Sequence, residues 1–254
     1  MSLEKDQVRP SLEAEHTPEA IRQRLQGPMK HSYLRDFIYG AIDGTVTTFA
    51  VVCGVQGAEL SGRVVVILGL ANLLADGFSM GASNFLGTRT ERQLLQRARR
   101  REEHHVTVIP EGEREEIRQI FAEKGFAGED IERVVSIITS DLDRWVDTML
   151  KEELGLPLKG VSPFRAAFTT FAAFVVVGIV PLLAYLYHLL APANQITVFV
   201  WSAVLTGFAF FAIGTIKGRF VEQRWHIAGL ETLGIGGAAA VLAFAVGALL
   251  RGLA

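Results

Sequence analysis

Five long apolar stretches divide this chain, and they limit the possible folds more than any other feature. They cover about residues 37–58, 64–86, 164–190, 196–216 and 227–250, and Pro181 interrupts the third. Each approaches the roughly 20 apolar residues that a helix needs to cross the hydrocarbon core of a bilayer. The chain as a whole is 50% hydrophobic, which is high for a soluble domain. The sequence therefore predicts an all-α membrane protein with five transmembrane helices.

Charged residues are concentrated between the second and third apolar stretches. Residues 89–160 contain more than half of the Asp and Glu residues and about half of the Lys and Arg residues. A bilayer imposes this separation, because ionised side chains are costly at its centre. We expect a polar amino-terminal segment (1–30), transmembrane helices 1 and 2 (31–88), a cytoplasmic metal-binding helical domain inserted between helices 2 and 3 (89–162), and transmembrane helices 3 to 5 (163–254).

Loops rich in Lys and Arg alternate along the chain with loops that contain few of them. Lys and Arg residues occur before helix 1, in the insert and between helices 4 and 5, whereas the loop after helix 1 has only Arg63. Basic loops tend to stay in the cytoplasm. We therefore expect a cytoplasmic amino terminus and insert, with the carboxy terminus outside. The run "RARRR" fits a membrane-surface anchor better than a nucleic-acid patch, so no nucleic-acid partner is expected.

The insert shows the signals of two or three amphipathic helices. One begins after Pro110, has acids in its first turn and ends at Gly125. The stretch 128–156 carries apolar residues at a helical period. These residues are Ile131, Val134, Val135, Ile138, Leu142, Trp145 and Met149. Such stripes are expected to be buried against one another or against a partner copy. In the amino-terminal segment, "TPEAIRQRL" predicts a brief amphipathic helix at the inner membrane surface or on the insert.

Several polar residues lie inside the first two predicted membrane helices. Asp43 is one to two turns inside helix 1, and Asp36 precedes it by seven residues on about the same face. In helix 2, Asn72, Asp76, Met80 and Asn84 recur every four residues and form one polar stripe. A carboxylate within the bilayer must face protein, water or an ion, so these residues are candidates for a transport path. The alternative is that the carboxylates only bind neighbouring helices and that Met80 only fills space.

The residue types in this path suit a divalent transition metal. Carboxylate oxygens bind hard cations, and a thioether adds preference for softer metals over calcium or magnesium. Asp43 and Met80 could thus bind ferrous iron. A buried carboxylate favours its protonated form and a bound cation favours the ionised form, so metal and protons could be exchanged.

The insert contains a second group of candidate metal ligands. Glu102 and His105 are three residues apart, as are Glu113 and Glu116, so each pair shares one helical face. Further candidates near the end of the insert are Met149 and Glu153, and the second choices are Glu103, Glu115 and Glu152. The alternative is a solvated charged face. One Glu-x-x-His pair is half of a di-iron pattern, which requires two, so a ferroxidase centre has little support.

Three segments resemble the vacuolar iron transporter family, in its prokaryotic form. They are "RDFIYGAIDGTVTTFAVVCGV", "GLANLLADGFSMGASNFL" and "KEELGL". The resemblance covers about residues 31–254. It implies a homodimer of five-helix protomers in a prokaryotic inner membrane, exporting Fe²⁺ in exchange for protons, with no permanent cofactor. Mn²⁺, Zn²⁺ and Co²⁺ are further candidate cargo.

The resemblance also implies roles for individual residues. Asp43 and Met80 match the family's path between two subunits. A cytoplasmic domain with several Glu and a Met collects metal, and the matching residues are Glu102, Glu113, Glu116, Met149 and Glu153. His105 stands where another Glu is expected, and Leu150 where a further acid occurs. Histidine remains a competent ligand for iron or zinc.

The function expected from the sequence is thus the transport of divalent metal, and not an enzymatic activity. Two other classes of function remain open at this point. One is a non-transporting membrane scaffold or metal sensor whose insert binds partners, and the other is a membrane-bound ferroxidase. Asp43 distinguishes the first from a transporter, because a scaffold should tolerate its loss.

Overall fold

The computed structural model describes residues 13–26, 32–191 and 194–253. It divides into two units at residues 32 and 33. In the first, helix α2 (Pro18–Gln26) covers the predicted amino-terminal amphipathic helix. All regular elements described in the second unit are helices. The all-α prediction is therefore confirmed.

Five helices of the second unit are long and apolar enough to cross a membrane, as predicted. They are α3 (Leu34–Gly57), α4 (Gly62–Val108), the segment Pro163–His188 that comprises α8 (Pro163–Gly178), η1 (Val180–Leu182) and α9 (Leu183–His188), α10 (Gln195–Phe220) and α11 (Trp225–Leu250). A short 3₁₀ turn, η2 (Arg251–Leu253), follows the last helix.

Helix α3 lies in the middle of this bundle, where it packs against α4, α8, α10 and α11. Small residues allow the backbones to approach closely. A Cβ added at Gly44 would lie 2.4 Å from the carbonyl oxygen of Phe174 in α8. The two helices therefore touch at the residue that follows Asp43, which fixes the depth and direction of Asp43 in the bundle.

The third membrane segment is interrupted at the predicted place. Helix α8 ends at Gly178, and the backbone passes through the 3₁₀ turn that contains Pro181 before α9 begins. Proline cannot donate to an α-helical ladder. The carbonyl of Pro181 accepts a hydrogen bond of 2.6 Å from the Ser202 hydroxyl of α10, which ties the break to its neighbour.

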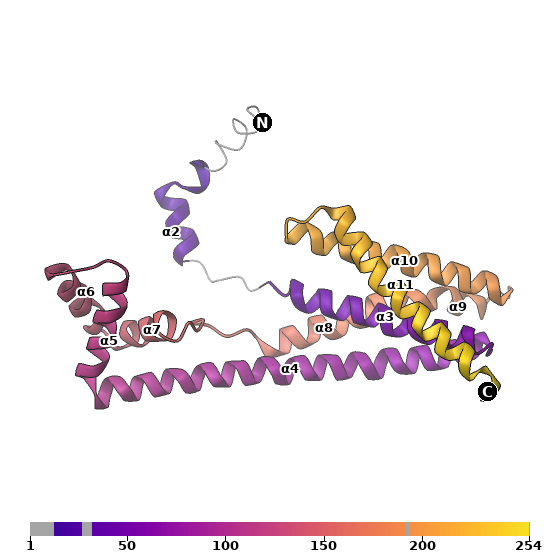
Figure 1. Cartoon of the computed structure of the whole chain (residues 1–254), viewed down its shortest axis with the longest axis horizontal. Coiled ribbons are helices and arrows are strands. Elements are labelled where there is room, and N and C mark those ends of the chain that lie inside the picture. Colours follow the sequence, from indigo (N-terminus) through magenta and orange to yellow (C-terminus); the bar gives the residue numbers. More distant parts are fainter. Residues whose placement is uncertain (1–12, 27–31, 192–193, 254) are drawn as a thin grey trace. The chain divides into compact units, whose positions relative to one another are not determined.

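Helix α4 continues without a break from the apolar bundle into the insert (Figure 1). Its 47 residues correspond to a length of about 70 Å. Residues 62–86 are mostly apolar, and the remainder is rich in Arg and Glu. At the predicted boundary between membrane helix and insert, residue 88, only the side-chain polarity changes. The backbone stays helical throughout.

Three short helices pack at the far end of α4 (Figure 1). They are α5 (Pro110–Glu123), α6 (Glu129–Thr139) and α7 (Leu142–Glu152). Helix α5 ends just before Gly125, which has φ +92°, a conformation that glycine adopts easily. The apolar stripes of the three helices meet in one core with Val106 of α4.

The periodic stretch after Gly128 is two helices rather than one. Asp141 separates α6 from α7, and its side chain accepts a 2.8 Å hydrogen bond from the backbone N–H of Arg144 as an N-cap. Trp145 and Met149 are buried as expected, whereas Leu142 is 52% exposed because it begins the second helix.

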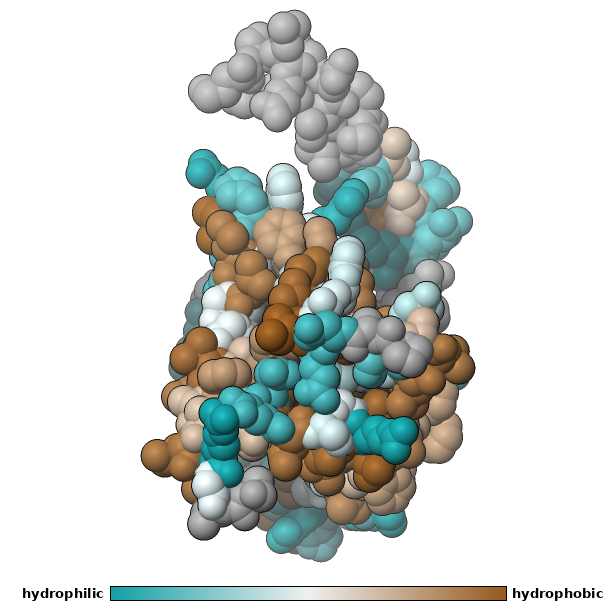
Figure 2. All heavy atoms as spheres, turned by 90° about the vertical axis from the view of Figure 1, so that its right-hand side faces the viewer, coloured by the Kyte–Doolittle hydropathy of each residue, from teal (hydrophilic) through white to brown (hydrophobic). Residues whose placement is uncertain are grey.

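Large hydrophobic side chains remain exposed along every helix of the bundle. Figure 2 looks at the end of the bundle opposite the insert, where hydrophilic residues gather between hydrophobic flanks. A surface of this kind is what contact with lipid requires. The multi-pass membrane architecture is therefore supported by both the helix lengths and the surface.

Candidate metal site in the insert and polar path in the bundle

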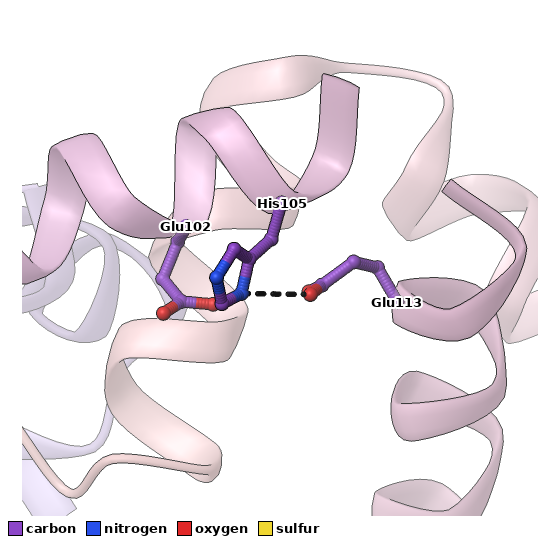
Figure 3. Close-up of side chains that lie close together, drawn as sticks. All are labelled: Glu102, His105 and Glu113. Atoms are coloured by element: carbon purple, nitrogen blue, oxygen red, sulfur yellow. Dashed lines mark ion pairs between the residues drawn. The ribbon is translucent and has the colours of Figure 1, made fainter. Parts of the chain in front are cut away.

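The turn between α4 and α5 brings together the best-formed ligand group in the described part of the chain. Glu102 and His105 lie on the last two turns of α4, and Glu113 lies on the first turn of α5. One ligand atom from each residue lies within 4.8 Å of the other two. Figure 3 shows the three side chains directed toward one another from the two helices. The sequence predicted Glu102 with His105 and Glu113 with Glu116 as two separate pairs. The structure brings members of both pairs into one site.

The two glutamates of this group are buried. Glu102 is 2% exposed and Glu113 is 1% exposed, whereas His105 is partly open to solvent. His105 Nδ1 lies 3.3 Å from Glu113 Oε1. The other oxygen of Glu113, Oε2, is buried and has no hydrogen-bond partner in the described structure. A buried carboxylate oxygen without a partner is costly, and a bound cation would satisfy it.

Negative charge accumulates around this site. Burial raises the pKa of Glu113 to about 7, and the neighbouring carboxylates of Glu116 and Glu102 add to the effect. The pKa of Glu153 is raised as well, by desolvation and by the charges of Glu102 and Glu116. These shifts place four of the predicted acidic ligands within electrostatic reach of one another. A divalent cation would relieve the repulsion between them.

The second-choice ligands differ from the first-choice ligands because each of them forms an ion pair with an Arg or Lys side chain. Glu103 pairs with Arg99 at 3.2 Å, Glu115 pairs with Arg118, and Glu152 pairs with Lys124. Hydrogen bonds from Gln119 and Arg118 lower the pKa of Glu115, and the hydrogen bond from Lys124 lowers the pKa of Glu152. Carboxylates that already have a cationic partner are poorer candidates for a metal. Met149 is fully buried in the core of the insert, and its role as a ligand stays a prediction.

The candidate path residues in the bundle lie on the two neighbouring helices α3 and α4. Asp43, Asp76, Met80 and Asp36 are all partly buried. The charges of Asp43 and Asp76 interact across the two helices. This face of the chain is thus polar and partly open, although it lies within membrane-spanning segments.

At the insert end of this face, a hydrogen-bond network joins three membrane helices. The Asn84 amide donates to Asp36 Oδ1 at 2.9 Å and to Thr170 Oγ1 of α8 at 2.7 Å. Thr88 donates to the Asn84 side-chain oxygen at 3.1 Å. The Thr170 hydroxyl donates to the backbone carbonyl of Asp36 at 3.4 Å, so Asp36 has partners in both neighbouring helices. Sequence reasoning placed Asp36 and Asn84 on polar faces but missed Thr170, because nothing in the sequence relates α8 to them.

Sequence reasoning also missed an ion pair between α10 and α11. Lys217 Nζ of α10 lies 3.3 Å from Glu231 Oε2 of α11. Glu231 is the seventh residue of the last apolar helix, and an acid at that position was a signal that could have been noticed. A pair of opposite charges can be accommodated near a helix end where a single charge would be costly.

Comparison with known proteins identifies the family of this chain. A model of the VIT family matches residues 34–248. The chain belongs to the VIT family. It is 33% identical to a vacuolar iron transporter of Toxoplasma gondii over 225 residues, which is 86% of this chain and 74% of that protein. It is 34% identical to vacuolar iron transporter 1 of Arabidopsis thaliana over 214 residues, 83% of each chain.

The relatives of this VIT family member include a vacuolar iron transporter of Plasmodium berghei, 31% identical over 225 residues. All three relatives carry names of transporters and not of enzymes. The predicted family and the predicted non-enzymatic class are thereby confirmed. The relatives' names refer to vacuoles, so a prokaryotic inner membrane stays a prediction for this chain.

Proposed function

We propose that this VIT family member transports ferrous iron across its membrane, out of the cytoplasm and in exchange for protons. The observation that carries the proposal is the group of Glu102, His105 and Glu113, in which both glutamates are buried and one Glu113 oxygen has no hydrogen-bond partner among the described residues. Two carboxylates and one imidazole suit Fe²⁺, and also Mn²⁺, Zn²⁺ and Co²⁺. The names of the relatives favour iron among these ions.

In this proposal the insert collects metal on the cytoplasmic side and the polar face of α3 and α4 passes it through the membrane. Asp43 supplies the charge that replaces part of the ion's hydration shell, and Met80 supplies a softer ligand. Asp36 extends the polar face toward the insert, where it pairs with Asn84, and Asp76 adds a second carboxylate near Asp43. Protonation of a path carboxylate would help to release the metal, which couples the two fluxes.

The path is proposed to be completed by a second copy of the chain. Its four candidate residues are partly exposed on a single protomer within membrane-spanning helices. Charged side chains do not normally face lipid at that depth. A homodimer that pairs the two polar faces would shield the carboxylates and line a path between the subunits.

The decisive experiment measures Fe²⁺ uptake and internal pH in inside-out proteoliposomes under a pH gradient. Wild type should accumulate iron and move protons in the opposite direction. Asp43→Asn keeps the size of the side chain but removes its charge, and should lose most of both fluxes. Glu123→Gln, at an exposed position at the end of α5, is the matched control and should behave as wild type.

Unchanged iron uptake by folded Asp43→Asn would contradict the role of Asp43 in the transport path. Absence of iron uptake by wild type would favour a non-transporting scaffold or sensor. Iron uptake without proton movement would contradict the exchange mechanism alone. Measurement in vesicles of the opposite orientation tests the direction, because export from the cytoplasm should appear as uptake only when the insert faces outward.

A further inference from the structure

A basic pocket lies where α4 meets the linker between α7 and α8, outside the metal site and the polar path. Arg89 and Arg92 line it from α4, and Ser162 and Phe164 line it from the start of α8. Its volume is about 430 Å³. An adjoining cavity shares Arg92 and Ser162 and adds Lys159 from the linker. Asp and Glu do not occur among the residues that line either cavity.

The cations of this pocket are not neutralised by the protein. Arg89, Arg92 and Lys159 are exposed and have no ion pair among the described residues. Arg99, two turns further along α4, differs in this respect, since it pairs with Asp143 at 2.8 Å and Asp147 at 2.5 Å. The pocket therefore carries net positive charge that an external anion could balance.

An apolar groove begins where the basic pocket ends. Phe85 and Phe164 line both the basic pocket and this groove. The groove continues between α4 and α8 along Phe78 and Phe168, which are 70% and 61% exposed. Its floor is formed by the close approach of the two helices at Gly81, where an added Cβ would lie 3.1 Å from Phe171 Cβ.

The groove lies within the membrane and the basic pocket lies at its edge. Helices α4 and α8 are both part of membrane-spanning segments, and Phe78 to Phe85 extend over about 10 Å of α4. Arg89 and Arg92 follow directly, in the first charged turns of that helix. An apolar chain in the groove and a negative group in the pocket would thus have to belong to one amphipathic molecule. A phospholipid has this arrangement of charge and hydrocarbon.

We propose that this groove binds an anionic phospholipid, with its headgroup phosphate at Arg89, Arg92 and Lys159 and one acyl chain along Phe78 and Phe168. The headgroup joins α4 to the linker that leads from the insert back to the membrane. Gly160 of that linker already packs on Arg92, since an added Cβ would lie 3.3 Å from Arg92 Cγ. The bound lipid stabilises the attachment of the insert to the bundle.

The test compares the full-length protein in neutral detergent with added phosphatidylglycerol or phosphatidylcholine. Native mass spectrometry counts bound lipid, and the thermal unfolding midpoint reports stabilisation. Wild type should retain phosphatidylglycerol and gain stability from it, with little effect of phosphatidylcholine. The double variant Arg89→Gln/Arg92→Gln should bind phosphatidylglycerol at least tenfold more weakly. Arg97→Gln/Arg100→Gln removes the same charge from exposed positions of α4 outside the cavities and should bind as wild type.

Three outcomes would overturn the proposal. Equal loss of lipid in both double variants would mean non-specific attraction to the charged helix. Equal stabilisation by inorganic phosphate would mean a phosphate pocket without a role for the groove. Disulfide-linked dimers formed by Phe168→Cys in a Cys53→Ala background, in membranes, would mean that a second copy covers the groove.

Discussion

His105 Nδ1 of α4 lies 3.3 Å from Glu113 Oε1 of α5, across the turn that joins the two helices. Only one oxygen of the buried Glu113 carboxylate is occupied by this contact. The imidazole and the free oxygen therefore form an open site that a cation can enter from the partly exposed side of His105. This relationship gives a direct prediction for metal binding.

Glu113→Gln should weaken Fe²⁺ binding to the full-length protein by at least tenfold, because it removes a charged ligand that the amide cannot replace. Anaerobic titration calorimetry measures the change. Glu115→Gln is the matched control, since Glu115 lies on the same helix but pairs with Arg118. An equal loss in both variants would indicate that the insert attracts metal by overall charge alone.

Metal binding should also depend on pH through Glu113. Its pKa of about 7 means that a proton must leave before the metal can bind. Affinity should rise by about tenfold per pH unit below 7 and level off above it, for one released proton. Titrations between pH 5.5 and 8 check this slope. A flat profile in wild type would show that Glu113 is not a ligand.

The stability of the metal-free protein should change with pH in the opposite direction. The folded state holds a proton on Glu113 up to about pH 7, whereas an unfolded glutamate releases it near 4.5. The folded state thus binds more protons in this window, so the free energy of unfolding falls as pH rises from about 4.5 to 7. The effect is about 3 kcal/mol at most. Urea unfolding of wild type and Glu113→Gln measures it, and the variant should show a weaker dependence.

Gly44→Ala should disturb the packing that positions Asp43. The added Cβ would lie 2.4 Å from the Phe174 carbonyl oxygen, so α3 and α8 must separate. Overpacking of this kind typically costs about 1–3 kcal/mol. Thermal unfolding in detergent and Fe²⁺ flux should both decrease. Gly237→Ala is the control, because no atom lies within 4 Å of its added Cβ, and it should unfold no earlier than wild type.

Asn84→Leu should loosen the junction of three membrane helices. It removes the donors to Asp36 and Thr170 and leaves both oxygens without this partner. Hydrogen bonds between membrane helices contribute about 0.6–2 kcal/mol each. We expect a lower unfolding midpoint, measured in detergent, and a partial rescue by Asn84→Gln. An unchanged midpoint in Asn84→Leu would mean that water replaces the amide.

The separation of apolar and charged residues was sufficient to predict the membrane architecture. The five spans, the break at Pro181 and the helical insert follow from run lengths, proline and periodicity. These signals are local, because each depends on residues close together in the chain. The family motifs in helices 1 and 2 are local in the same sense, and they indicated the family before any fold was known.

The sequence by itself determined which segments enter the membrane and which residue types could bind metal. Only the tertiary structure decided which acids are available. Glu102 and Glu113 belong to different helices and become buried together because the chain turns at Ile109 and Pro110. Glu103 and Glu115 pair with Arg residues one turn away on their own helices, whereas Glu152 pairs with Lys124, which is distant in sequence. The burial of the ligand group and the pairing of Glu152 depend on the packing of helices, and no local pattern of residues specifies that packing.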